Sequence, residues 1–87
     1  MAQTNGLVVE DESIVSKDIH HSLKKIGYTV VGAANNGESA VSLALEHRPD
    51  IILMDIMLKG EMNGIEAADA IRKETNIPVI FLTAYAD

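Results

Sequence analysis

The sequence alternates between short apolar runs and amphipathic stretches, and this alternation constrains the fold more than any other feature. The apolar runs lie at 7–9, 28–33, 51–55 and 77–82, with polar or turn-forming residues close to their ends. Short runs of this kind are typical of buried strands. In the stretches between them, apolar residues recur at three- and four-residue intervals, as on one face of a helix. The order β-α-β-α-β-α-β predicts a parallel sheet with helices on both faces, in a single domain spanning 1–87.

Each of the three predicted helices has a recognisable start. The first begins at Ser13, and its buried face is predicted to hold Ile14, Val15, Ile19, Leu23 and Ile26. Asn36 follows a turn-forming stretch and is expected to cap the second helix. Asn63, with Glu66 three positions later, indicates a capping box at the start of the third helix. The buried stripe of that helix is predicted to be Ile65, Ala68 and Ile71.

Composition and charge exclude several classes of function. The chain has 13 acidic and 7 basic residues, for a net charge of −6. A nucleic-acid-binding surface needs clustered Lys and Arg, so direct nucleic-acid binding is not expected. No apolar run approaches the roughly 20 residues that cross a bilayer, and the first residues do not resemble a signal peptide. We therefore expect a cytoplasmic protein without a membrane segment.

Acidic residues lie where two of the predicted strands end. Asp55 ends one apolar run, and Glu10 and Asp11 directly follow another. The carboxyl ends of parallel strands meet at one edge of the sheet, where clustered carboxylates repel one another and need a cation. Oxygen ligands in a chain without Cys favour Mg²⁺ over Mn²⁺ or Ca²⁺. Because the hydroxyl of Thr83 and the backbone N–H of Ala84 are suited to a phosphoryl oxygen, the pattern predicts metal-assisted phosphoryl transfer to Asp55.

Motifs of competing phosphate-binding proteins are absent. The sequence contains no G-x-x-x-x-G-K-[ST] loop, and no G-x-G-x-x-G follows the first strand. A phosphatase of the haloacid-dehalogenase type carries D-x-D-x-T, and here Met57 stands where the second Asp would follow Asp55. A Mg²⁺-dependent phosphatase is therefore a disfavoured alternative.

Four segments in this order resemble the receiver domain of two-component response regulators. They are LVVEDE at 7–12, LMDIML at 53–58, NGIE at 63–66 and PVIFLTA at 78–84. The resemblance covers nearly the whole chain from residue 7 onwards. It implies a flavodoxin-like, doubly wound α/β fold with strand order 2-1-3-4.

The resemblance also implies roles for individual residues. Asp55 would be the phospho-acceptor, which takes its phosphoryl group from a histidine kinase or a phosphotransfer protein. Glu10 and Asp11 would bind Mg²⁺, together with Asp55 and the backbone carbonyl of Met57. Thr83 would be the switch hydroxyl that turns towards the phosphoryl group. The domain would catalyse its own phosphorylation and dephosphorylation without being a stand-alone enzyme.

Some positions depart from the family pattern. The chain stops after its fourth strand, so the fifth strand, the last helices and a phosphate-binding Lys of the family are missing, and we expect an incomplete receiver domain within a longer chain. Lys59 stands where many members have Pro. Met57 and Tyr85 occupy positions that tune the loss of phosphate in the family, and their side chains predict a long-lived phospho-form.

The resemblance leaves the output open. Expected partners are the phosphoryl donor, a downstream output domain or protein, and a second copy of the domain. Two alternatives are a receiver-like module that binds proteins without being phosphorylated and the receiver part of a larger hybrid histidine kinase.

Overall fold

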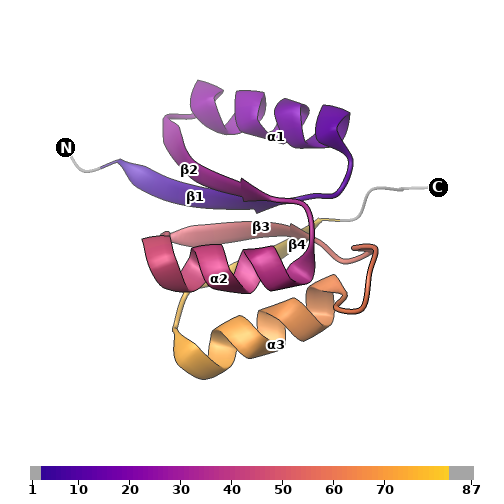
Figure 1. Ribbon diagram of the computed structural model, residues 1–87. Helices are drawn as coiled ribbons and strands as arrows, with labels where there is room; N and C mark the ends of the chain where they lie inside the picture. The colour runs from indigo at the N-terminus through magenta and orange to yellow at the C-terminus, as the bar shows by residue number, and fades with distance from the viewer. Residues whose placement is uncertain (1–2, 83–87) are drawn as a thin grey trace.

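A four-stranded parallel sheet separates two layers of helices (Figure 1). The computed structural model describes residues 3–82. The strands are β1 (Thr4–Val9), β2 (Tyr28–Ala34), β3 (Ile51–Asp55) and β4 (Val79–Leu82), in the spatial order β2-β1-β3-β4. Helix α1 (Ser13–Lys25) covers one face of the sheet, and α2 (Gly37–His47) and α3 (Gly64–Glu74) cover the other (Figure 1). The predicted α/β fold with strand order 2-1-3-4 is confirmed.

The predicted helix caps are present. The side chain of Asn36 accepts a hydrogen bond of 2.8 Å from the backbone N–H of Ser39. At the start of α3, Asn63 and Glu66 form a full capping box, each side chain accepting from the other residue's backbone N–H at 2.9 Å. These bonds satisfy helix N–H groups that have no partner within the helix, so they fix where α2 and α3 begin.

Three strands differ in length from the prediction. Strand β2 ends at Ala34, one residue later than predicted. Strand β1 begins at Thr4 rather than at residue 7, because the backbone of the polar lead also pairs with β2, Thr4 opposite Tyr28. Strand β4 begins at Val79, one residue after Pro78. Proline has no N–H to donate, and here only its carbonyl pairs, accepting from the N–H of Ile52 at 3.0 Å.

The main hydrophobic core lies between the sheet and the pair α2 and α3. Strand residues on this side are completely buried, and small helix residues pack against them; the set is Leu7, Ile52, Met54, Ala40, Ala44, Ala67, Ala68 and Ile71. Alanines at the contact let the two helices lie close to the sheet and to each other. This tight packing holds the starts of α2 and α3 in place near the ends of the strands.

The other face of the sheet is less well covered. Within α1 only Leu23 is buried, whereas Ile14 is 76% exposed and Ile26, the residue that follows the helix, is 66% exposed. The prediction that these two isoleucines are buried is wrong. The same prediction for Ile65 of α3 is also wrong, since Ile65 is 52% exposed. An apolar stripe is buried only where another element faces it, and α1 is the only described helix on its side of the sheet. Strand β4 is an edge of the described sheet, and its Ile80 is 46% exposed.

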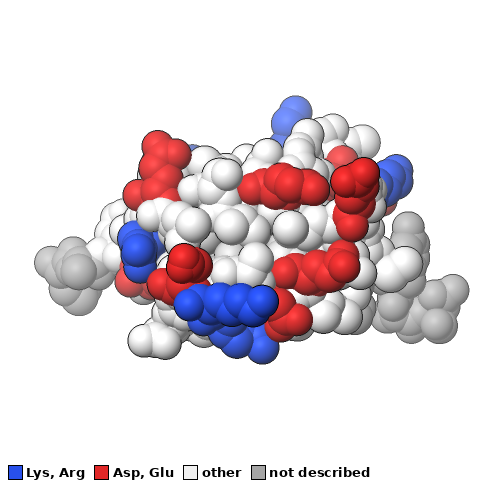
Figure 2. Space-filling view, turned by 60° about the horizontal axis from the view of Figure 1, so that its bottom comes forward, with Lys and Arg blue, Asp and Glu red and all other residues white. Residues whose placement is uncertain are grey.

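The surface carries mixed charges with an acidic excess. Figure 2 shows the side of α2 and α3, where acidic side chains lie in several separate places and some basic ones gather in one small group beside acidic neighbours. This agrees with the net charge of −6. Within residues 3–82, every helix is too short or too polar to cross a membrane.

Candidate functional site

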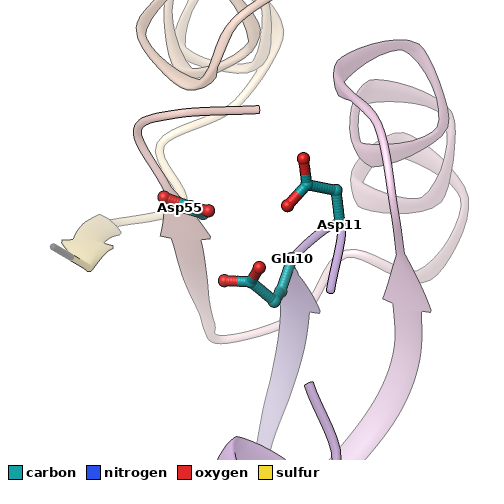
Figure 3. A group of neighbouring side chains, drawn as sticks. All are labelled: Glu10, Asp11 and Asp55. Carbon is teal, nitrogen blue, oxygen red and sulfur yellow. The ribbon is translucent and has the colours of Figure 1, made fainter. Parts of the chain in front are cut away.

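Three carboxyl groups meet where β1 and β3 end. Asp55 is the last residue of β3, and Glu10 and Asp11 directly follow β1 (Figure 3). One oxygen from each group lies within 4.8 Å of the others. Glu10 and Asp55 are each only 4% exposed, and Asp11 is half-buried. The parallel pairing of β1 with β3 thus brings together residues that are far apart in the sequence, as the topology predicts.

Backbone N–H groups partly neutralise this cluster. Each carboxyl group accepts one such bond: Asp55 Oδ1 from Met57 (3.0 Å), Glu10 Oε2 from Glu12 (3.0 Å) and Asp11 Oδ2 from Lys59 (3.2 Å). The only ion pair among residues 3–82 is between Asp69 and Arg72 on α3, so no basic side chain of that part of the chain forms a salt bridge with the cluster. The site therefore has an excess of negative charge.

Glu10 shows the electrostatic cost of this arrangement. Burial raises the pKa of Glu10 from 4.5 to about 7, and the negative charge of Asp55 adds to the effect. The hydrogen bond from the Glu12 N–H favours the charged carboxylate and opposes the rise in pKa. A divalent cation bound at the cluster would lower the pKa of Glu10 again, because it stabilises the ionised carboxylate. The donors are carboxylate oxygens only, and this set fits Mg²⁺.

The loop of residues 56–63, which we call the acceptor loop, connects Asp55 to α3. The N–H of Gly64 donates to the carbonyl of Ile56 at 3.1 Å. A Cβ atom on Gly64 would collide with the carbonyl oxygen of Asp55 and would lie 2.9 Å from the Cα of Ile56. Glycine is therefore required for α3 to begin directly against the end of β3. The Asn-Gly dipeptide at this point in the sequence is the signal that could have indicated it.

The remaining predicted site residues are only partly placed. Met57 is 72% exposed, and its backbone N–H donates a hydrogen bond to Asp55. Thr83 and Ala84 lie outside the described residues, as does Tyr85. The backbone N–H of Lys59 on Asp11 was not anticipated, because nothing in a sequence pattern marks a single loop amide as a donor.

A cleft lies beside two of the three carboxyl residues. A cleft of about 640 Å³ opens beside Glu10 and Asp11, and residues from the starts of α1 and α2 line it. Ser13, Ser16, Glu38 and Ser39 contribute polar groups to its walls. Asp55 does not line this cleft, which therefore borders the cluster on the side of Glu10 and Asp11.

Comparison with known proteins gives a consistent result. Residues 7–87 match the family described as response regulator receiver domain. The transcriptional regulatory protein PdtaR of Mycobacterium tuberculosis is 38% identical over 80 residues, which make up 92% of this chain and 38% of PdtaR. The phyllosphere-induced regulator PhyR of Methylorubrum extorquens is 36% identical over 85 residues, 97% of this chain and 32% of PhyR. This chain thus spans well under half the length of these curated relatives.

Solved structures agree with the sequence matches. The signal receiver domain of a modulated diguanylate cyclase from Desulfovibrio desulfuricans superposes with a TM-score of 0.90 at 40% identity, covering 97% of this chain and 67% of that one. The receiver domain of PhyR from Erythrobacter litoralis superposes with a TM-score of 0.88 at 33% identity, covering 98% of this chain and 66% of that one.

Proposed function

We propose that this chain, which belongs to the response regulator receiver domain family, accepts a phosphoryl group on Asp55 in a Mg²⁺-dependent reaction of two-component signalling. The observation that carries the proposal is the convergence of Glu10, Asp11 and Asp55, whose oxygens lie within 4.8 Å of one another. A nucleophilic carboxylate beside an acidic pair at one sheet edge has the groups that phosphoryl transfer requires.

In the proposed reaction, an oxygen of Asp55 attacks the phosphorus of a phosphohistidine on a kinase or phosphotransfer protein. The P–N bond breaks, its electron pair returns to the imidazole nitrogen, and that nitrogen takes a proton from solvent. The product is an acyl phosphate on Asp55. Because Met57 N–H donates to Oδ1 of Asp55, it orients the carboxylate and leaves Oδ2 as the attacking atom.

Glu10, Asp11, Asp55 and the backbone carbonyl of Met57 would hold Mg²⁺. When bound, the ion would offset the negative charge of the carboxylates and of the phosphoryl oxygens. Glu10 would act as a ligand in its ionised form, so its proton would leave as the site fills.

Thr83 and the backbone N–H of Ala84 complete the proposal as contacts of the phosphoryl oxygens. Phosphorylation would replace a single carboxylate charge by a dianionic group, and the turn of Thr83 towards it would switch the surface that the output recognises. With an exposed Met57 beside the acceptor and Tyr85 after the switch residues, neither side chain would orient an attacking water as an acid or amide could. The phospho-form would therefore be long-lived.

The output of the signal would lie outside the receiver domain. The relatives include a transcriptional regulator and PhyR, and one PhyR structure is a complex with the anti-sigma factor NepR. For this chain we infer a downstream domain or protein as the partner, with a second copy as a further one, in the cytoplasm. A hybrid histidine kinase that contains this receiver domain would use the same Asp55 chemistry.

Intact-mass measurement after incubation with acetyl phosphate and Mg²⁺ tests the proposal. The wild type is expected to gain the mass of one phosphoryl group, and Asp55→Asn is expected to gain none. Asp69→Asn is the matched control, because Asp69 is a solvent-exposed acid on α3 remote from the cluster, and it should behave as the wild type. Removing Mg²⁺ with a chelator should abolish the gain.

Two results would contradict the proposal: no mass gain in the wild type, or an equal gain in Asp55→Asn. A phosphorylation-independent binding module would give the first result, and a phosphatase would release phosphate without retaining the added mass. Because no Lys of this chain matches the phosphate-binding Lys of the family pattern, the measurement is made on the full-length protein.

A further inference from the structure

We propose that Gly37 is a positioning residue for the acceptor loop, and that it acts through Met62. The inference rests on the proposed function, because the loop carries groups that hold Asp55 and Asp11. Gly37 is the first residue of α2, and Met62 is the second-last residue of the acceptor loop. The two are buried and half-buried, respectively, and Met62 packs against the main core.

The start of α2 lies directly on Met62. A Cβ atom on Gly37 would be 2.7 Å from the Cγ, 2.8 Å from the carbonyl oxygen and 2.9 Å from the Cβ of Met62. Non-bonded carbon atoms pack best at about 3.5–4.0 Å, so each of these approaches is too close. Any residue other than glycine at this position would push Met62 away, and its backbone would move with it because the carbonyl oxygen is one of the atoms involved.

Neither helix can easily absorb the displacement. The start of α2 is fixed by the Asn36 cap, and its Ala40 and Ala44 are completely buried. Met62 directly precedes Asn63, whose capping box fixes the start of α3. The acceptor loop between them has no regular secondary structure, so the strain falls on the loop.

The other end of the acceptor loop reaches the carboxyl groups. Met57 N–H donates to Asp55 at 3.0 Å, and Lys59 N–H donates to Asp11 at 3.2 Å. A loop displaced at Met62 therefore misplaces both donors and the carbonyl of Met57, one of the proposed Mg²⁺ ligands. The contact between Gly37 and Met62 thus sets the geometry of the site from outside it.

The test compares Mg²⁺ binding by the full-length wild type and the Gly37→Ala variant, using isothermal titration calorimetry. The dissociation constant for Mg²⁺ is expected to rise about tenfold, the lower end of the losses seen when groups that orient metal ligands are changed. The rate of phosphorylation by acetyl phosphate should fall at low Mg²⁺ and recover largely when Mg²⁺ is saturating. Glu46→Ala is the matched control, because Glu46 is an exposed residue of the same helix and does not line the cleft beside Glu10 and Asp11.

Met62→Ala separates positioning from a general effect on the fold. It removes the Cγ atom that is nearest to the added methyl group. Gly37→Ala should therefore raise the dissociation constant for Mg²⁺ by a smaller factor in the Met62→Ala background than in the wild type. Alone, Met62→Ala should weaken Mg²⁺ binding measurably, because it loosens the loop. This single variant also tests the proposal if Gly37→Ala does not fold.

The proposal is overturned if Gly37→Ala lowers the thermal midpoint while the folded protein binds Mg²⁺ like the wild type. It would also be overturned if Gly37→Ala raised the dissociation constant for Mg²⁺ by the same factor in both backgrounds. A third contradicting result is a Met62→Ala variant that binds Mg²⁺ like the wild type. Failure of the proposed function is a separate result, since it would appear in the wild type as the lack of any phosphoryl mass gain.

Discussion

Glu10→Gln is the substitution that best tests the electrostatics of the site. It keeps the size of the side chain but removes the carboxyl group whose pKa burial raises from 4.5 to about 7. Between these two values the folded protein holds a proton on Glu10 that the unfolded chain has already lost. The folded state thus binds more protons than the unfolded state, so stability falls as the pH rises through this window.

The size of the effect follows from the same values. A pKa raised from 4.5 to about 7 corresponds to about 3 kcal/mol, at about 1.36 kcal/mol for each pKa unit. Below pH 4.5 the wild-type Glu10 is neutral, and Gln should change the free energy of unfolding little. Above pH 7 the wild type carries a buried charge that Gln does not, so the variant should be more stable by up to about 3 kcal/mol.

Urea denaturation with a chelator at pH 4, pH 6 and pH 8 measures this difference. With Mg²⁺ at pH 8 the wild type should become more stable than the variant, because the ion binds the wild type more tightly than a variant that lacks one carboxylate ligand. Glu12→Gln is the matched control, since Glu12 is exposed and contributes only its backbone N–H to the cluster. The reasoning is refuted if the free energies of unfolding of wild type and variant differ by the same amount at all three pH values. It is also refuted if the wild type is the more stable protein at pH 8 without Mg²⁺.

Two further substitutions test single hydrogen bonds near the site. Lys59→Pro removes the N–H that Asp11 accepts at 3.2 Å and should weaken Mg²⁺ binding about fivefold in calorimetry, equivalent to about 1 kcal/mol, whereas Lys59→Ala keeps the N–H and should bind like the wild type. Equal losses in both variants would assign the effect to the lysine charge instead. Asn63→Ala breaks the capping box with Glu66 and should lower the free energy of unfolding in urea by about 1–2 kcal/mol. Asn63→Asp retains the cap and should stay close to the wild type, and a neutral Asn63→Ala would show that the cap contributes nothing.

The centre of the site could be predicted from the sequence because sheet topology determines it. Once the strands that end at Val9 and Asp55 are parallel neighbours, the residues at their carboxyl ends must meet. Glu10, Asp11 and Asp55 follow from this rule without knowledge of any side-chain packing. The helix caps at Asn36 and Asn63 were predictable for a similar reason, since each depends on residues three positions apart.

Features that depend on packing in three dimensions were not predictable in this way. The spacing of Ile14 and Ile26 identifies the apolar stripe of α1, but it does not tell which parts of the stripe another element covers. The pKa of Glu10 depends on how deeply the strand end is buried, and a neighbouring acid alone gives no magnitude. The contact of Gly37 with Met62 joins a helix start to a loop that follows a different strand, a pairing that no local pattern specifies.

The position of β1 between β2 and β3 also determines when the acidic site can exist. The pairing of β1 with β3 closes a long stretch of chain, as the hydrogen bond from Asn5 to Asp50, 45 residues apart, illustrates. During synthesis, Glu10 and Asp11 are made well before Asp55, and they stay separated from it until the two central strands join. In the folded protein, the carboxyl groups of Glu10 and Asp11 can move away from Asp55 in this way only if the hydrogen bonds between β1 and β3, the two central strands, are broken. Slow hydrogen exchange at the amides of Val8 and Leu53, which lie opposite each other in that pairing, would show that the site opens only with global unfolding.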